Sequence, residues 1–200
     1  GNAQPGGTVT YELPYEVDGV KGLNMVFRLV AGQRGTAVAS TFGYVDYVGL
    51  ALLEEVTVRF GTERIQILRP LELFFKMHAY MDNDLRNCIR NLVGGGLTLA
   101  QRYQRLTSGE QQIVVPLLTL MGLHLRADIS QTLMVRAMTE RWRMTVKFAQ
   151  VNQVIDSTSA NTIQIPPTAT AAAIPLASTA LFSECYLYAE GIHIADDERK

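Results

Sequence analysis

The sequence predicts an all-β fold: an eight-stranded antiparallel jelly-roll sandwich with a small helical insertion, in a single domain of residues 1–200. Three observations carry this prediction. Apolar and polar residues alternate strictly from Arg141 to Phe148 (RWRMTVKF). The stretch Leu53–Leu68 has the pattern of a hairpin. About eight such segments are separated by turn-rich connections, without the alternating helices that a parallel sheet requires.

Composition and charge describe an ordered globular chain. Of the 200 residues, 48% are hydrophobic and 18% are charged, a balance that supports a buried core. The 18 lysines and arginines nearly cancel the 19 aspartates and glutamates, which leaves a formal net charge of −1. A dedicated nucleic-acid binder carries a basic excess, because phosphate neutralisation dominates its affinity. The charge balance therefore argues against direct nucleic-acid binding.

Strands are predicted first at Thr8–Leu13 and Leu23–Val30, and then in the hairpin. Gly61-Thr62 is a two-residue loop with glycine first, as a type II′ turn requires. Pairing Phe60 with Glu63 places apolar residues opposite one another on one face, and a slip of one residue would mix the faces. Arg59 would then face Arg64, a mildly unfavourable pair. The residues assigned to the core are Val56 opposite Ile67 and Val58 opposite Ile65.

One helical block, residues 70–108, follows the hairpin. Pro70 suits the first position of a helix over Leu71–Met81. Asp82 to Asp84 supply caps for a second helix, which ends at a run of three glycines, and a third is predicted over Leu97–Leu106. Long insertions between strands often contact partners, although packing within the domain is an equal alternative. The candidate subunit-contact residues are Leu85, Ile89, Leu92, Tyr103 and Leu106.

Further strands are predicted at Gln112–Leu120, Thr132–Met138 and Leu181–Ile194. In RWRMTVKF the basic residues lie on the face opposite the aromatic ones, so stacking and phosphate contact cannot combine on one surface. Period-two alternation of this kind is typical of a half-buried strand. The residues on its dry side, assigned to the core, are Trp142, Met144, Val146 and Phe148.

No catalytic, metal or cofactor site is predicted. Cys88 and Cys185 are far apart and outside any CxxC motif, which favours two buried, reduced thiols. The three histidines share no metal-ligand spacing, and neither GxSxG nor a P-loop motif occurs. The uncharged run Ser157–Ser183 contains three prolines, so we interpret it as an extended surface loop and expect no membrane-spanning segment. The histidines are His78, His124 and His193.

Three segments in order resemble the major capsid proteins of nucleocytoplasmic large DNA viruses. The first is DYVGLALLEEVTVRFGTERIQI (Asp46–Ile67), with an Ala-Leu, a strand, a glycine turn and a returning strand. The second joins IVVPLLTLM to TLMVRAMTERWRMTVKF, and the third is ALFSECYLYAEGIHIADDERK. Thr132-Leu133-Met134 lacks the proline that the family often has. The Glu-Arg-aromatic sequence at Glu140 is similar to the African-swine-fever-virus-like branch. The residues that carry the motifs are Pro116, Leu117, Glu140, Arg141, Glu198 and Arg199.

The resemblance implies a structural protein rather than an enzyme. The chain would be the first of two jelly rolls in a longer protein, and it would form trimeric, pseudo-hexagonal capsomers of an icosahedral shell. Its implied partners are two further copies in a homotrimer, neighbouring capsomers and minor capsid proteins. Its implied location is the virion capsid, assembled in the host cytoplasm.

A ligand- or carbohydrate-binding jelly-roll module is the alternative function. Such a module would present exposed aromatic side chains on one sheet face. The candidates are Tyr44, Tyr47, Tyr186 and Tyr188, and strand alternation predicts that most of them are buried.

Overall fold

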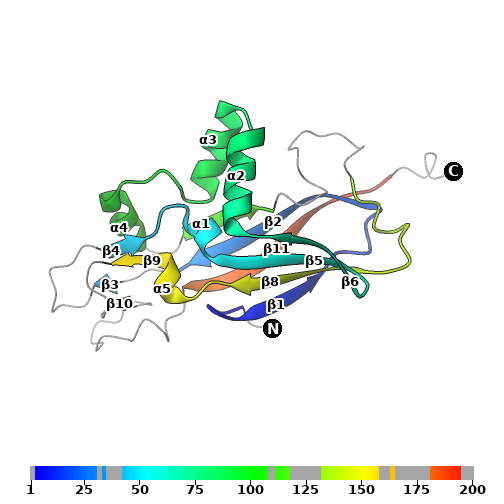
Figure 1. The fold of residues 1–200 in the computed structure, drawn as a ribbon, viewed down its shortest axis with the longest axis horizontal. Coiled ribbons are helices and arrows are strands. Elements are labelled where there is room, and N and C mark those ends of the chain that lie inside the picture. The colour runs from blue at the N-terminus through cyan, green and yellow to red at the C-terminus, as the bar shows by residue number, and fades with distance from the viewer. Residues whose placement is uncertain are drawn as a thin grey trace.

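The computed structural model describes residues 3–30, 33–34, 42–107, 111–117, 132–157, 163–164 and 181–194. Two antiparallel sheets lie one behind the other and form a sandwich (Figure 1). The front sheet in that view, which we call sheet A, has the order β1-β8-β5-β6. Its strands are β1 (Thr8–Glu12), β8 (Trp142–Phe148), β5 (Leu53–Phe60) and β6 (Glu63–Leu68).

The second sheet, sheet B, has the order β11-β2-β7. Its strands are β11 (Phe182–Ile192), β2 (Gly19–Leu29) and β7 (Gln111–Pro116). Strands near both ends of the chain therefore pair with each other in one sheet. The antiparallel two-sheet arrangement confirms the all-β class that the alternation predicts.

The core lies between the sheets, where alternate residues of each strand point inward. Met144, Val146 and Phe148 of β8 are buried, and Trp142 is half-buried with its ring 5.0 Å from that of Phe60. Three phenylalanines join the sheets: Phe27 of β2 contacts Phe148 and Phe182 with ring centroids 6.1 and 5.5 Å apart. Burial of each such side chain contributes about 1.5–3 kcal/mol to stability.

The hairpin register predicted from the sequence is wrong beyond Arg64. Phe60 pairs with Glu63 and Arg59 with Arg64 as expected, and Gly61 has the positive φ that the turn requires. The register then shifts by one residue, so Val58 pairs with Gln66 and Val56 with Leu68. This β-bulge turns Ile65 outward to 43% exposure and leaves Ile67 half-buried, while Val56, Val58 and Leu68 take the core positions.

The predicted strand Thr132–Met138 is also wrong. Leu133 makes a two-way backbone hydrogen-bonded bridge to Val20, with N···O distances of 2.8 and 2.9 Å. The chain turns directly afterwards, because the Met138 amide donates to the Val135 carbonyl. One bridge followed by a turn leaves no room for a strand.

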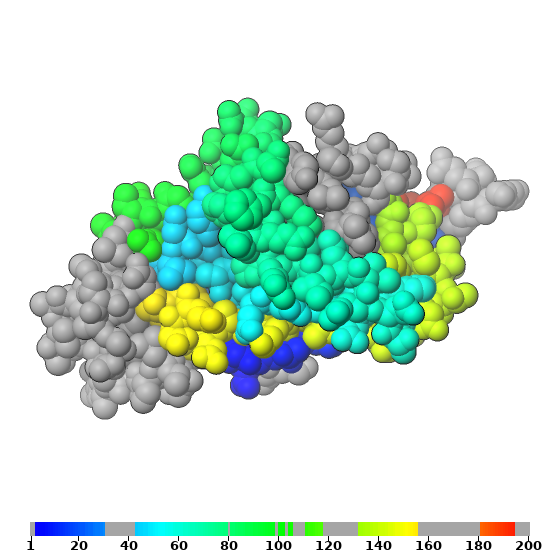
Figure 2. All heavy atoms as spheres, viewed as in Figure 1, coloured from blue at the N-terminus to red at the C-terminus, as the bar shows by residue number. Residues whose placement is uncertain are grey.

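The three expected helices are present between β6 and β7, and α2 and α3 stand up from the sandwich (Figures 1 and 2). Pro70 occupies the start of the first helix. The Asp82 carboxylate caps the second by accepting a 2.8 Å hydrogen bond from the Leu85 amide. The helices are α2 (Pro70–Tyr80), α3 (Asn83–Leu92) and α4 (Leu99–Thr107).

Two small ribbons and two single-turn helices complete the described residues. The sequence reasoning missed these short elements, because two to four residues are too few to show a period. The ribbons are β4 (Phe42–Tyr44) with β9 (Ile155–Ser157), and β3 (Gln33–Arg34) with β10 (Ile163–Gln164). The short helices are α1 (Val48–Ala51) and α5 (Val151–Val154).

Candidate assembly surfaces

Within the described ranges, no three His, Cys, Asp or Glu side chains gather as a metal site. His78 Nδ1 lies 2.9 Å from the Phe74 carbonyl oxygen and its ring stacks on Phe74, so the side chain serves packing. His193 is exposed beside Asp18, and His124 lies outside the described residues. No described helix is long and apolar enough to cross a membrane.

The two cysteines are free thiols in different environments. Cys185 faces the interior, where its Sγ lies 3.6 Å from the Tyr11 hydroxyl, and burial raises the pKa of its thiol to about 11. Cys88 is exposed on α3, so the expectation that both thiols are buried is wrong for Cys88. Neighbouring residues of a helix point about 100° apart, so Cys88 faces solvent although Ile89 beside it is buried.

A hollow of about 460 Å³ lies beside the first strand. Backbone and amide side chains dominate its lining, and no titratable side chain lines it. The hollow therefore offers neither a nucleophile nor a general base. Its lining residues are Gln4, Pro5, Gly6, Gly7, Gln150, Val151 and Asn152.

The helical insertion exposes apolar residues in addition to those predicted to contact subunits. Ile89 is buried in the core, so the intradomain alternative holds for it, while Leu85 is half-buried and Leu92 is 45% exposed. The side chains of Tyr103 and Leu106 lie outside the described residues. Leu71 and Phe75 are the most exposed large apolar residues described, at 64% and 60%. The sequence reasoning did not select this pair. The clue in the sequence is that Leu71 and Phe75 are four residues apart on a helix with apolar residues on several sides, so the core cannot cover all of them.

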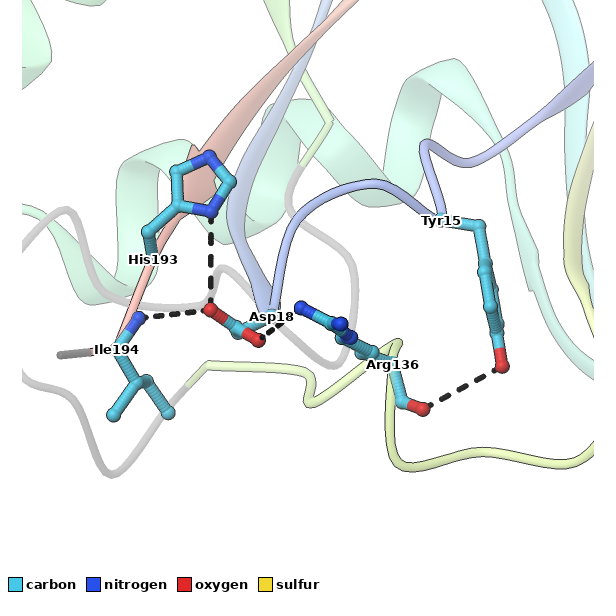
Figure 3. Close-up of polar contacts among 5 residues, drawn as sticks. All are labelled: Tyr15, Asp18, Arg136, His193 and Ile194. Atoms are coloured by element: carbon cyan, nitrogen blue, oxygen red, sulfur yellow. Dashed lines mark hydrogen bonds and ion pairs between the residues drawn. The ribbon is translucent and has the colours of Figure 1, made fainter. Parts of the chain in front are cut away.

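A buried carboxylate joins three distant segments at one end of the sandwich (Figure 3). Asp18, in the loop before β2, is only 5% exposed. Its Oδ2 accepts a 2.9 Å hydrogen bond from the Ile194 amide and lies 3.8 Å from His193 Nδ1. Its Oδ1 accepts from Arg136 Nη1 at 3.4 Å. We call Asp18, Arg136, His193 and Ile194 the Asp18 junction; nothing in the local sequence signals it, since its members are far apart along the chain.

The outer face of sheet A is polar and carries a row of arginines. Arg143, Arg59 and Arg64 pair side by side across β8, β5 and β6, and all three are exposed. We call these three residues the arginine row. Glu12 continues the row on β1 and binds Arg141 and Arg143 at 3.0 and 3.1 Å. These hydrogen bonds lower the pKa of the Glu12 carboxyl, that from Arg141 most.

The outer face of sheet B carries tyrosines instead. Tyr186 and Tyr188 are 44% and 56% exposed on β11, which contradicts the expectation that most candidate tyrosines are buried. Tyr44 is buried and Tyr47 is half-buried. The burial pattern explains the difference: after a register shift near Phe182, Cys185, Leu187 and Ala189 take the inward positions of β11, so Tyr186 and Tyr188 between them point outward. Exposed glutamates flank the two rings, and we call Glu184, Tyr186, Tyr188 and Glu190 the tyrosine face.

The remaining motif residues lie apart from one another. Pro116 ends β7 half-buried, and Leu117 is buried with its amide donating to the Leu23 carbonyl. Glu140 is exposed close to the turn glycine Gly61, and Arg141 lies 6.0 Å from the Tyr15 ring centroid. Glu198 and Arg199 lie outside the described residues.

Comparison with solved structures finds the same fold in viral capsid proteins. The crystal structure of VP54 of PBCV-1, fitted into a cryo-EM reconstruction of the virophage Sputnik, matches with a TM-score of 0.69 and 17% sequence identity. A quasi-atomic model of the PBCV-1 virus capsid matches with 0.68 and 17%. Both matches cover 100% of this chain and 41% of the other. The Faustovirus major capsid protein matches with 0.63 and 11% identity, over 99% of this chain and 53% of that one.

No protein-family model matches the sequence, and no curated protein sequence matches it. At 11–17% identity the structural matches establish the fold, which is the jelly-roll fold of these capsid proteins. The chain spans about half the length of the solved proteins, or less.

Proposed function

We propose that this chain is a structural protein of a viral capsid. The observation that carries the proposal is that the matches to viral capsid structures cover 99–100% of the chain, and not only a common sheet motif. A building role also suits the surfaces described above. Exposed apolar and polar side chains lie on the outward faces of the described residues. The titratable side chains described there form ion pairs and rows on the surface, and no three His, Cys, Asp or Glu among them gather as a metal site.

The architecture suits a load-bearing block. The two sheets share one apolar core, which holds the sheet planes about 10 Å apart. The two outer faces are therefore fixed relative to each other. The Asp18 junction ties the loop before β2 to the end of β11, which limits fraying of the last described strand. A rigid block of this kind can position the same contact surfaces in every copy.

The finer assignment follows from the resemblance. The chain forms homotrimeric, pseudo-hexagonal capsomers of an icosahedral shell and contacts neighbouring capsomers and minor capsid proteins. It is the first of two jelly rolls in the full protein, which is supported by its covering 41–53% of the solved capsid proteins. The sequence around Glu140 supports membership of the African-swine-fever-virus-like branch. Its place is the virion capsid, assembled in the host cytoplasm.

Analysis of purified virus particles tests the proposal. Quantitative mass spectrometry of intact particles should find peptides of this chain among the most abundant, and gold-labelled antibodies against it should mark the outer shell. Capsomers released from particles should contain three copies by native mass spectrometry. Finding the chain in infected cells but absent from purified particles would contradict the capsid assignment.

A carbohydrate-binding module is the second candidate, favoured by one observation. Tyr186 and Tyr188 present two exposed rings on one sheet face, as an aromatic sugar platform would. A glycan array separates the two functions: saturable binding that Tyr188→Ala abolishes would support the module, and a capsid block predicts no binding.

A further inference from the structure

The two outer faces of the sandwich carry opposite chemistry. Sheet A presents the arginine row, and sheet B, on the other side, presents two tyrosines flanked by glutamates. Both faces belong to regular strands whose inner residues form the core, so both are fixed in geometry. Contacts within each sheet do not account for the adjacent arginines of sheet A or for the exposed tyrosines of sheet B.

The arginine row is unfavourable by itself. Like charges placed directly opposite one another across strands repel, and here Arg59 has an arginine neighbour on both sides. Glu12 binds Arg143, but within the part of the chain that the structure describes no carboxylate lies within ion-pair distance of Arg59 or Arg64. An acidic surface placed over the row would remove this repulsion.

The tyrosine face has the organisation of a protein interface. Tyr186 aligns with Val26 and Val114 across the sheet, and Tyr188 with Asn24 and Pro116, which gives a largely apolar centre. Glu184, paired with Arg28 at 3.2 Å, and Glu190 lie at its two ends. An apolar centre with exposed tyrosines and a charged rim is the usual anatomy of a contact between proteins.

We propose that the arginine row of one copy of this chain packs against the tyrosine face of the next copy. The proposal rests on the proposed capsid function and names the surfaces by which neighbouring copies meet. Glu184 and Glu190 supply the carboxylates that the row lacks, with the two-pronged geometry that guanidinium groups favour. The tyrosine rings offer π faces to the same cations. Because the two faces differ, the contact is heterologous and repeats from copy to copy.

The size of the contact sets its strength. Three strands over the six residues of β7 present about 300 Å² of flat sheet, at about 3.3 Å per residue and 4.8 Å between strands. A stable free complex buries about 800 Å² per partner. The isolated chain should therefore associate weakly. In a shell, each copy would make several such contacts at once, and together they would hold the copies more tightly than one contact does.

Sedimentation velocity of the purified chain over a wide concentration range tests the contact. We expect weak self-association that weakens at least tenfold in Tyr188→Ser and in Arg59→Glu, and that declines with added salt. Tyr15→Ser and Glu16→Arg alter an exposed ring and an exposed charge elsewhere and should leave association unchanged. Thermal melts establish that each variant is folded.

A charge exchange gives the decisive measurement. Arg59→Glu and Glu190→Arg should each weaken self-association at least tenfold, because each places like charges in the contact. Combining both changes in one chain should restore association to within about threefold of the original chain, since the exchanged charges then face each other at every contact. A contact between two tyrosine faces would not be rescued in this way.

Each outcome bears on the proposal. Rescue in the double variant supports it, whether the copies form rings of one mass or open rows. Association that is insensitive to Tyr188 and Glu190, or no association at the highest concentration reached, overturns it. Binding of labelled heparin that Arg59→Glu abolishes, without any self-association, would instead assign the row to a polyanion. The particle measurements decide the capsid function separately.

Discussion

Removing the carboxylate of the Asp18 junction should destabilise the folded chain measurably. In Asp18→Ala the Ile194 amide loses an acceptor at 2.9 Å and the Arg136 guanidinium loses its partner at 3.4 Å. A hydrogen bond involving a charged group contributes about 1.5–3 kcal/mol. Arg136 is 56% exposed and can return to water, so most of the loss comes from the amide. We therefore expect a decrease of about 2–3 kcal/mol in the free energy of unfolding, or about 4–12 °C in melting temperature for a chain of this length.

Two matched variants make the Asp18 experiment specific. Asp18→Asn keeps an oxygen for the Ile194 amide and should lose about half as much stability, because only the charge is removed. Glu184→Gln removes a carboxylate from an ion pair that is half exposed, and such pairs contribute about 0–1 kcal/mol. Urea unfolding at pH 7, with the slope m compared among variants, gives the three values. The reasoning is refuted if Asp18→Ala loses no more stability than Glu184→Gln.

Three further predictions concern the core, the thiols and the pH dependence. Phe27→Ala should lose about 3–5 kcal/mol in urea unfolding, whereas Ile65→Ala, at a bulge position facing solvent, should lose less than about 1 kcal/mol; equal losses would contradict the observed register. At pH 8 a thiol reagent should modify Cys88 rapidly, and Cys185, whose pKa is raised to about 11, only after denaturation; two fast thiols in the native chain would refute this. Arg141 and Arg143 lower the pKa of the Glu12 carboxyl from 4.5, so their ion pairs stabilise the fold above pH 4.5. This stability is lost as the pH falls through the pKa of Glu12 in the folded chain. Glu12→Gln should therefore remove that part of the acid dependence of the melting temperature.

The alternation of residue types predicted the sheets because it reports burial directly. In β8 every second side chain meets the core, so the sequence alone was enough to assign Met144, Val146 and Phe148 to buried positions. The same rule failed in β6, where one extra residue at Ile65 changes which face each later residue takes. A β-bulge leaves no local mark in a segment where polar and apolar residues alternate, so the sequence could not locate it.

The surfaces were harder to predict than the core. The helical insertion was expected to use residues of α3 and α4 either for contacts with neighbours or for packing within the domain. Ile89 packs inward, and the most exposed apolar pair, Leu71 and Phe75, lies on α2. Which side of a helix faces the sandwich depends on how the helix is placed, and α2 has apolar residues on several sides. The Asp18 junction was beyond reach for another reason, since it joins residues separated by 118 and 176 positions.

The inner and outer faces of the sandwich are constrained by different requirements. An inner face must fill a fixed volume with apolar side chains, and many sequences satisfy this, which is why the fold persists at 11–17% identity to the solved capsid proteins. An outer face has no such requirement unless something covers it. A row of three arginines on one face and two exposed tyrosines between glutamates on the other are therefore better explained by contacts outside the domain than by folding. If Arg59 and Tyr188 can both be replaced by serine with no change in assembly, that explanation is wrong. The two outer faces would then be ordinary solvent-exposed surfaces.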